Sequence, residues 1–108
     1  MNAVIMPVLD NLAQTLDAIG DVLRQDVGDL CLLVINQGSS DETRQRLERI
    51  AQLEKRVLVW SHDPPLPSLA ATWNTALDFV WQSGGAHALV VNNDVRLHRS
   101  TYRMLHGA

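Results

Sequence analysis

Two kinds of apolar pattern alternate along the chain. Runs of consecutive apolar residues occupy residues 3–8, 30–35 and 88–91, and residues 56–60 are four apolar residues preceded by Arg56. Between these runs, apolar residues recur at the spacing of a helix face over residues 10–25, 39–53 and 68–81. Short continuous runs are typical of strands buried on both faces of a sheet, and the helically spaced stretches indicate amphipathic helices. The pattern predicts the element order β-α-β-α-β-α-β.

This alternation predicts an α/β protein with a Rossmann-like parallel sheet and helices on both faces. Parallel strands joined by right-handed crossovers favour a doubly wound arrangement, for which we expect the strand order 3-2-1-4. A length of 108 residues fits one domain spanning residues 1–108.

The helix ends and helix faces give finer expectations. Asp10 is placed to cap the first helix, and Ser39 opens an S-x-x-E capping box for the second. Leu53 is expected on the inward face of the second helix. Trp73 and Trp81 fall on the apolar stripe of the third, which favours core packing.

The charge balance of the chain limits its binding partners. The sequence has nine Lys and Arg and twelve Asp and Glu, for a net charge of -3, so nucleic acid and anionic membranes are poor candidates as partners. No stretch is long and apolar enough for a membrane span, and the start lacks the features of a secretory signal. Cys31 is the only cysteine, which excludes an intrachain disulfide. We therefore expect a cytoplasmic location.

Polar residues collect after three of the four predicted strands. They follow the first strand from Pro7 to Asn11, the second from Asn36 to Asp41, and the fourth from Asn92 to Asp94. In a doubly wound sheet these ends share the carboxyl edge, where ligands bind at the topological switch point. Turn chemistry alone explains any one cluster. Three coincident clusters favour a ligand site.

The sequence around these ends limits the ligand. Neither the dinucleotide fingerprint G-x-G-x-x-G nor the phosphate loop G-x-x-x-x-G-K-[ST] is present, and the only lysine is Lys55. A diphosphate at this edge would lack a glycine cradle. A divalent cation that bridges phosphate oxygens to Asp94 could replace such a cradle. Mg²⁺ and Mn²⁺ both suit these hard oxygen ligands.

In this order, the segments resemble the N-terminal, nucleotide-sugar-binding half of a family-2 glycosyltransferase of the A-type fold. Residues 4–11 resemble the opening V-I-P-x-Y-N, and residues 34–43 resemble V-V-D-N-G-S-x-D-x-T. Residues 69–77 stand where the family has a small-residue segment ending in A-x-N-x-G, and residues 90–95 resemble the D-x-D strand end in its N-x-D variant. The Gly-Ser-Ser-Asp element is the most specific of these.

The resemblance implies a nucleotide-diphosphate sugar as ligand and glycosyl transfer as the chemistry. The residues that it places in nucleotide binding are Pro7, Asp10, Asn36, Gly38, Ser39, Asp41, Asn74 and Asn92, with Asp94 holding the metal. Pro7 and Asp10 would line the nucleoside pocket. Asn36 takes the place of an acid that reads the base edge, and Asp94 would hold Mg²⁺ or Mn²⁺ on the diphosphate.

The departures from the family pattern leave two functions open. Asn36 and Asn92 replace acids, and the family's catalytic base and acceptor-binding segments follow the D-x-D strand. We therefore expect a truncated A-type fold without the acceptor-binding half, with catalytic residues and acceptor unassigned. The chain is expected to be a metal-dependent glycosyltransferase domain or a non-catalytic nucleotide-binding or assembly module. An uncovered edge of the fourth strand would favour homo-oligomers.

Overall fold

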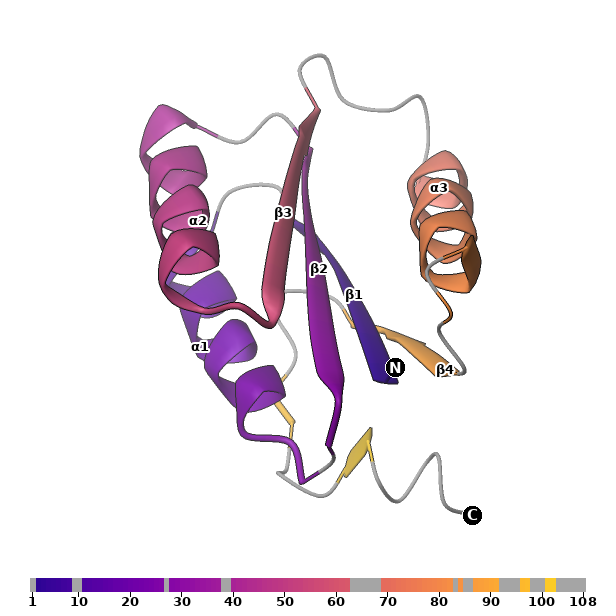
Figure 1. Cartoon of the computed structure of the whole chain (residues 1–108). Helices are drawn as coiled ribbons and strands as arrows, with labels where there is room; N and C mark the ends of the chain where they lie inside the picture. Colours follow the sequence, from indigo (N-terminus) through magenta and orange to yellow (C-terminus); the bar gives the residue numbers. More distant parts are fainter. Residues whose placement is uncertain are drawn as a thin grey trace.

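The computed structural model describes residues 2–8, 11–26, 28–37, 40–62, 69–82, 84, 87–91, 96–97 and 101–102. Its elements are β1 (Asn2–Val8), α1 (Leu12–Leu23), β2 (Leu30–Gln37), α2 (Asp41–Leu53), β3 (Val57–His62), α3 (Leu69–Gln82) and β4 (His87–Val90). The predicted alternation of strands and helices is confirmed (Figure 1).

The four strands form one parallel sheet in the order β3-β2-β1-β4, as predicted. β1 pairs with β2 on one side and with β4 on the other. β2 and β3 are therefore added on one side of β1 and β4 on the opposite side, so the strand order reverses between β1 and β4. α1 and α2 cover one face, and α3 covers the other (Figure 1). This is the expected arrangement of helices on both faces.

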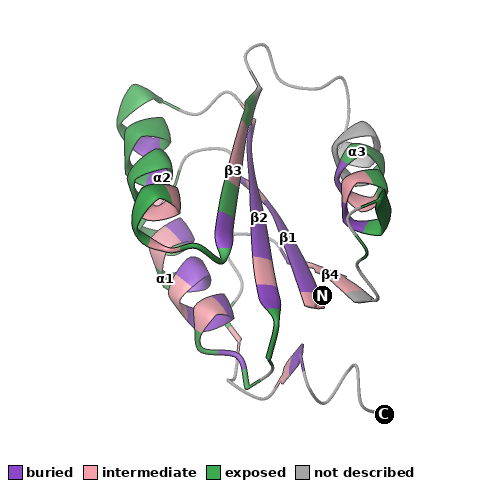
Figure 2. Ribbon diagram, viewed as in Figure 1, coloured by how far each residue is buried: buried purple, intermediate pink, exposed green. Residues whose placement is uncertain are grey.

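The central strands explain why their sequences read as unbroken apolar runs. Along β2, Leu32 and Val34 face α1 and α2, while Leu33 and Ile35 face α3. All four are at most 2% exposed, and burial is concentrated in β1 and β2 (Figure 2). A strand covered on both faces needs apolar side chains at every position.

Both helix starts differ from the sequence expectation by one residue. α1 begins at Leu12 and its cap position is Asn11, in the left-handed region at φ 57° with no side-chain cap bond, so the prediction of Asp10 as the cap is wrong. α2 begins at Asp41, and the Ser40 Oγ accepts the Thr43 backbone N–H at 3.4 Å. The cap is therefore Ser40 and not Ser39.

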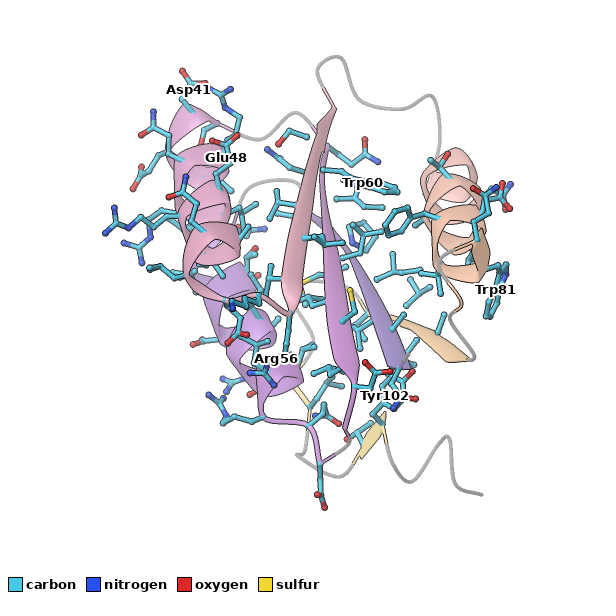
Figure 3. All side chains as sticks on the ribbon, viewed as in Figure 1. Asp41, Glu48, Arg56, Trp60, Trp81 and Tyr102 are labelled. Atoms are coloured by element: carbon cyan, nitrogen blue, oxygen red, sulfur yellow. The ribbon has the colours of Figure 1, made fainter. Side chains whose placement is uncertain are left out.

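Two apolar residues expected to face inward are exposed. Leu53 is the last residue of α2 and is 75% exposed, because it lies six residues after the buried Leu47 and therefore points about 120° away from it around the helix. Trp81 is 51% exposed on α3 (Figure 3). Val80 is buried, and the next residue of a helix points about 100° away from it. The side chain of Trp73 lies outside the described residues.

The chain after β4 returns to the face covered by α1. We call the described residues Arg96, Leu97, Thr101 and Tyr102 the return segment. Tyr102 is 2% exposed and joins the apolar cluster between the sheet and the first two helices, against which Leu97 also packs. Within the return segment, Tyr102 is therefore part of the core and Leu97 borders it.

Candidate functional site

The carboxyl ends of the strands bring three residues into one row. The register pairs Val8 of β1 with Asn36 of β2, and Asn36 with Ser61 of β3. The reversal of sheet order between β1 and β4 lies beside this row. Open α/β sheets bind their ligands at such a reversal, outside the carboxyl ends of the strands.

Asn36 is the buried polar residue of this row. It is 2% exposed, and its Nδ2 donates to the Ser61 Oγ at 3.5 Å. Strand alternation puts it on the same face as Val34, under α1 and α2. Burying an amide is costly unless its donors and acceptors are paired, so Asn36 is held in a defined orientation.

α2 starts directly beyond this strand end. Its N-cap, Ser40, also donates from Oγ to the Thr43 Oγ1 at 3.2 Å. The side chain of Asp41 is 87% exposed at the outer tip of the helix and pairs with Arg44, Nη2 to Oδ1 at 3.3 Å (Figure 3). Asp41 thus belongs to the first turn of α2, with its carboxylate in solvent.

Two further predicted site residues lie toward the α3 side of the sheet. Pro7 is half-buried and in register with Ile35, whose side chain faces α3. Asn74 is exposed on α3, two residues before the buried Ala76. Pro7 and Asn36 therefore stand at the same edge but on opposite faces. The predicted residues Asp10, Gly38, Ser39, Asn92 and Asp94 lie outside the described residues.

An aromatic pair joins α3 to the edge of the sheet. The Trp60 ring of β3 meets the Phe79 ring of α3 edge to face, with centroids 4.8 Å apart at 76° (Figure 3). Such pairs add about 1 kcal/mol beyond the area that they bury. The apolar stripe read from the sequence did not include Phe79.

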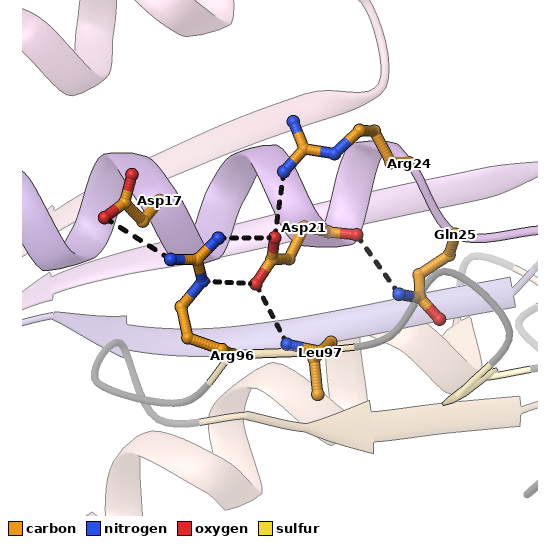
Figure 4. A network of polar contacts seen from close by, with 6 residues as sticks. All are labelled: Asp17, Asp21, Arg24, Gln25, Arg96 and Leu97. Carbon is orange, nitrogen blue, oxygen red and sulfur yellow. Dashed lines mark hydrogen bonds and ion pairs between the residues drawn. The ribbon is translucent and has the colours of Figure 1, made fainter.

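A buried carboxylate on α1 is the feature that sequence reasoning missed. Asp21 is 5% exposed. Its Oδ2 accepts from the Arg96 Nε at 2.7 Å and the Leu97 backbone N–H at 2.9 Å (Figure 4). Its Oδ1 accepts from the Arg24 Nη2 at 2.8 Å and the Arg96 Nη2 at 3.2 Å.

These bonds determine the charge state of Asp21. The Arg96 hydrogen bond, helped by those of Leu97 and Arg24, lowers the pKa of Asp21 from 3.8 to about 2, against the opposing effect of burial. The carboxylate is therefore ionised at neutral pH. Arg96 lies 75 residues further along the chain, so no local spacing could reveal the pair.

Gln25 makes a second connection to the return segment. It is 6% exposed, and its Oε1 accepts the Tyr102 backbone N–H at 2.8 Å. Its Nε2 donates to the Asp21 carbonyl O at 3.1 Å, which links the two connections (Figure 4). The end of α1 therefore binds the return segment at both of its described parts.

A hollow of about 480 Å³ lies elsewhere, along the outer face of α2. Its described lining residues are Glu42, Gln45, Arg46, Arg49, Ile50 and Leu53. All six come from one helix, and Asn36 and Ser61 are not among them. The hollow is therefore not part of the strand-end site.

The described part of the chain contains neither a cluster of metal ligands nor a membrane-spanning helix. Within it, no three His, Cys, Asp or Glu side chains gather closely enough to hold a metal ion. The helices of that part are also too short or too polar to cross a membrane.

One protein-family model matches almost the whole chain. The family model described as Glycosyl transferase family 2 matches residues 3–104. A search of curated proteins gave no match.

Solved structures resemble the chain over almost all of its length. S. aureus TarS 1-349 in complex with UDP-GlcNAc has a TM-score of 0.80 at 19% identity, covering 98% of this chain and 30% of that one. The mannosyltransferase PcManGT from Pyrobaculum calidifontis, in complex with GDP-Man and Mn²⁺, has a TM-score of 0.73 at 19% identity, covering 91% and 29%. The chain thus spans less than a third of either relative, and the likeness is one of fold.

Proposed function

The chain belongs to glycosyl transferase family 2, and from that membership we propose that it binds a nucleotide-diphosphate sugar at the carboxyl edge of its sheet for glycosyl transfer. The observation that carries this proposal is the buried Asn36 at the end of β2, beside the reversal of strand order. Structural relatives of this fold were solved with UDP-GlcNAc and with GDP-Man.

Each described residue has a definite part in the proposal. Asn36 offers an amide that both donates and accepts hydrogen bonds, which suits the edge of a base. Pro7 lines the nucleoside pocket on the α3 side of β1. Asn74 is exposed on α3, and the proposal includes it only as the family pattern assigns it to the nucleotide. Asp41 supports the loop between β2 and α2, in which Gly38 and Ser39 also contact the nucleotide.

A divalent cation belongs to the same proposal. Asp94 would hold Mg²⁺ or Mn²⁺ with Asn92 beside it, and Asp10 would complete the nucleoside pocket. Carboxylate, amide and phosphate oxygens are hard donors that suit either ion. When bound, such a cation stabilises the charge on a leaving diphosphate. The chain's own residues bind and orient the donor, and the acceptor and the catalytic base are not assigned.

The first test is calorimetric titration of the 108-residue chain. UDP, dTDP, GDP and CDP are each titrated with Mn²⁺ and with chelator. We expect one nucleotide to bind in a metal-dependent manner. Absence of binding by all four in a folded protein would contradict the proposal and favour an assembly module of the same fold.

Asp94→Ala localises the metal. The variant should lose metal-dependent nucleotide binding and keep the circular dichroism spectrum and melting temperature of the wild-type chain. Asp26→Ala, which also removes one carboxylate and lies at an exposed position after α1, serves as the matched control and should bind normally. Wild-type affinity in Asp94→Ala would remove that residue from the site. The cytoplasmic location stays a prediction.

A further inference from the structure

The chain that leaves β4 is held by described contacts on both sides of a short stretch. Val91, directly after the strand, is 5% exposed and donates its backbone N–H to the Ile5 carbonyl O at 2.9 Å. Arg96 and Leu97 are then bonded to Asp21 on α1. One end of the stretch is thus tied to β1 and the other to α1.

Resting on the proposed function, we propose that Asp21 is a positioning residue for the nucleotide-diphosphate site. Its buried carboxylate holds Arg96 and Leu97 on α1, and these residues follow Asp94 by two and three positions in the sequence. Asp94 stands in the sequence between Val91 and Arg96, inside the stretch whose ends are fixed.

The contacts of Asp21 distinguish it from its neighbour on the same helix. Asp17 also meets Arg96, Oδ2 to Nη1 at 3.7 Å, but its side chain is 62% exposed. Exposed pairs contribute little, whereas charge-assisted bonds to a buried carboxylate are strong. Only Asp21 receives the Leu97 backbone N–H among these contacts, and that bond holds the main chain itself.

The bond from the Leu97 backbone restricts the position of the main chain itself. An arginine side chain is long, and a pair made through it alone would leave the main chain free to shift. The 2.9 Å bond from the Leu97 N–H to the Asp21 Oδ2 removes that freedom. Groups that orient metal-binding residues from outside typically change metal affinity by about 10- to 100-fold when they are lost.

The test compares Asp21→Asn with Asp17→Asn, which removes a carboxylate from the same helix and the same arginine. UDP, dTDP, GDP and CDP are titrated calorimetrically with Mn²⁺ and with chelator, well below the melting temperature of each variant. For the nucleotide that binds the wild-type chain, we expect Asp21→Asn to weaken the Mn²⁺-dependent affinity about tenfold. Asp17→Asn should bind like the wild-type chain.

Amide hydrogen exchange of the unliganded protein gives a second readout. The Leu97 amide should exchange faster in Asp21→Asn, and amides of β2 should exchange at the wild-type rate. Faster Leu97 exchange with unchanged nucleotide affinity would overturn the proposal, because Asp21 would then be only structural. Unchanged exchange and unchanged affinity would overturn it as well.

Nucleotide binding by the wild-type chain distinguishes failure of this inference from failure of the proposed function. A wild-type chain that binds no nucleotide would overturn both, whereas wild-type binding that Asp21→Asn leaves intact overturns the inference alone. If Asp21→Asn does not fold, Asp21→Glu carries the test, since it keeps the charge but displaces the carboxylate by one methylene. Its Mn²⁺-dependent affinity should fall, and an unchanged value would overturn the proposal.

Discussion

Asn36 places an amide directly after a run of apolar residues in its strand. Val34 and Ile35 precede it at 0% exposure, and Asn36 itself is 2% exposed. An apolar side chain at this position would extend the core by one more residue. The amide instead sits at the strand end, within reach of Ser61 on one side and of the carboxyl edge on the other.

Replacing Asn36 tests that assignment. Asn36→Leu is close in volume but cannot hydrogen-bond, so nucleotide affinity measured by calorimetry should fall about tenfold, the usual consequence of losing a polar contact to a base. Asn36→Asp keeps two acceptor oxygens and should retain binding of a base that presents an N–H group. Gln52→Leu, which removes an amide at an exposed position of α2, is the control and should bind like the wild-type chain. Equal affinity in Asn36→Leu and the wild-type chain would contradict base contact by Asn36.

Asp21 predicts an acid-dependent part of the stability. Its pKa is about 2 in the folded chain against 3.8 ordinarily, so in acid the unfolded state takes up the proton first. The stabilisation is complete above the ordinary pKa and disappears as the pH falls toward the folded value. Between about pH 5 and pH 2, the free energy of unfolding measured in urea should therefore fall more steeply for the wild-type chain than for Asp21→Asn.

The control for this comparison is again Asp17→Asn. Its carboxylate is exposed, so the variant should follow the wild-type pH dependence. At neutral pH, Asp21→Asn should be less stable by about 2 kcal/mol, because hydrogen bonds to an ionised group are lost. Parallel pH curves for the wild-type chain and Asp21→Asn would show that the ion pair does not contribute.

At the scale of elements, the start of α2 gives a clear experiment. Ser40 caps the helix by accepting the Thr43 N–H, so Ser40→Ala should lower the free energy of unfolding by about 1 kcal/mol. Ser39→Ala, one residue earlier, should leave it nearly unchanged. Urea titration monitored by circular dichroism measures both. A larger loss for Ser39→Ala would restore the capping box expected from the sequence.

The elements also show what the sequence could predict. The apolar run from residue 30 to 35 identified β2 because a doubly covered strand tolerates only apolar side chains along its length. The cap of α2 lies one residue later than predicted, because S-x-x-E spacing alone does not determine the residue at which the helix begins. The prediction that Trp81 packs in the core was wrong, because periodicity identifies the apolar face of a helix but not which of its side chains the sheet covers.

The site was predictable only in part for a related reason. Asn36 stands at a strand end that local sequence marks, and parallel pairing necessarily aligns it with Val8 and Ser61. The bond between Asp21 and Arg96 depends on the return of the chain across the sheet, 75 residues later. No periodicity or spacing encodes such a contact. Interactions of that kind require the tertiary structure.

For the whole molecule, the edge of β4 predicts self-association. In the described sheet β4 pairs with β1 on one side, and Ala88, Leu89 and Val90 are half-buried. An unpaired strand edge is a template for pairing with another chain. Sedimentation should show association that increases with concentration, with protection of β4 amides increasing in parallel. A strictly monomeric species at high concentration would contradict this expectation.

The two faces of the sheet predict unequal resistance to opening. Among described residues, the cluster toward α1 and α2 includes the return segment's Tyr102, whereas the cluster toward α3 is smaller and ends at the Trp60–Phe79 contact. Local opening follows the amount of buried apolar contact. In native-state hydrogen exchange, amides of α3 should therefore open at lower free energy than those of α1.

Phe79→Ala tests whether the α3 layer opens independently. The loss of a half-buried ring should cost about 2 kcal/mol, less than for a fully buried phenylalanine, and should accelerate exchange in α3. Phe79→Leu, which keeps most of the apolar volume, should have a smaller effect. Because α1 is fastened to the return segment through Asp21 and Gln25, its amides should keep wild-type protection at low denaturant. Equal acceleration in α1 and α3 would mean that both layers open as one cooperative unit.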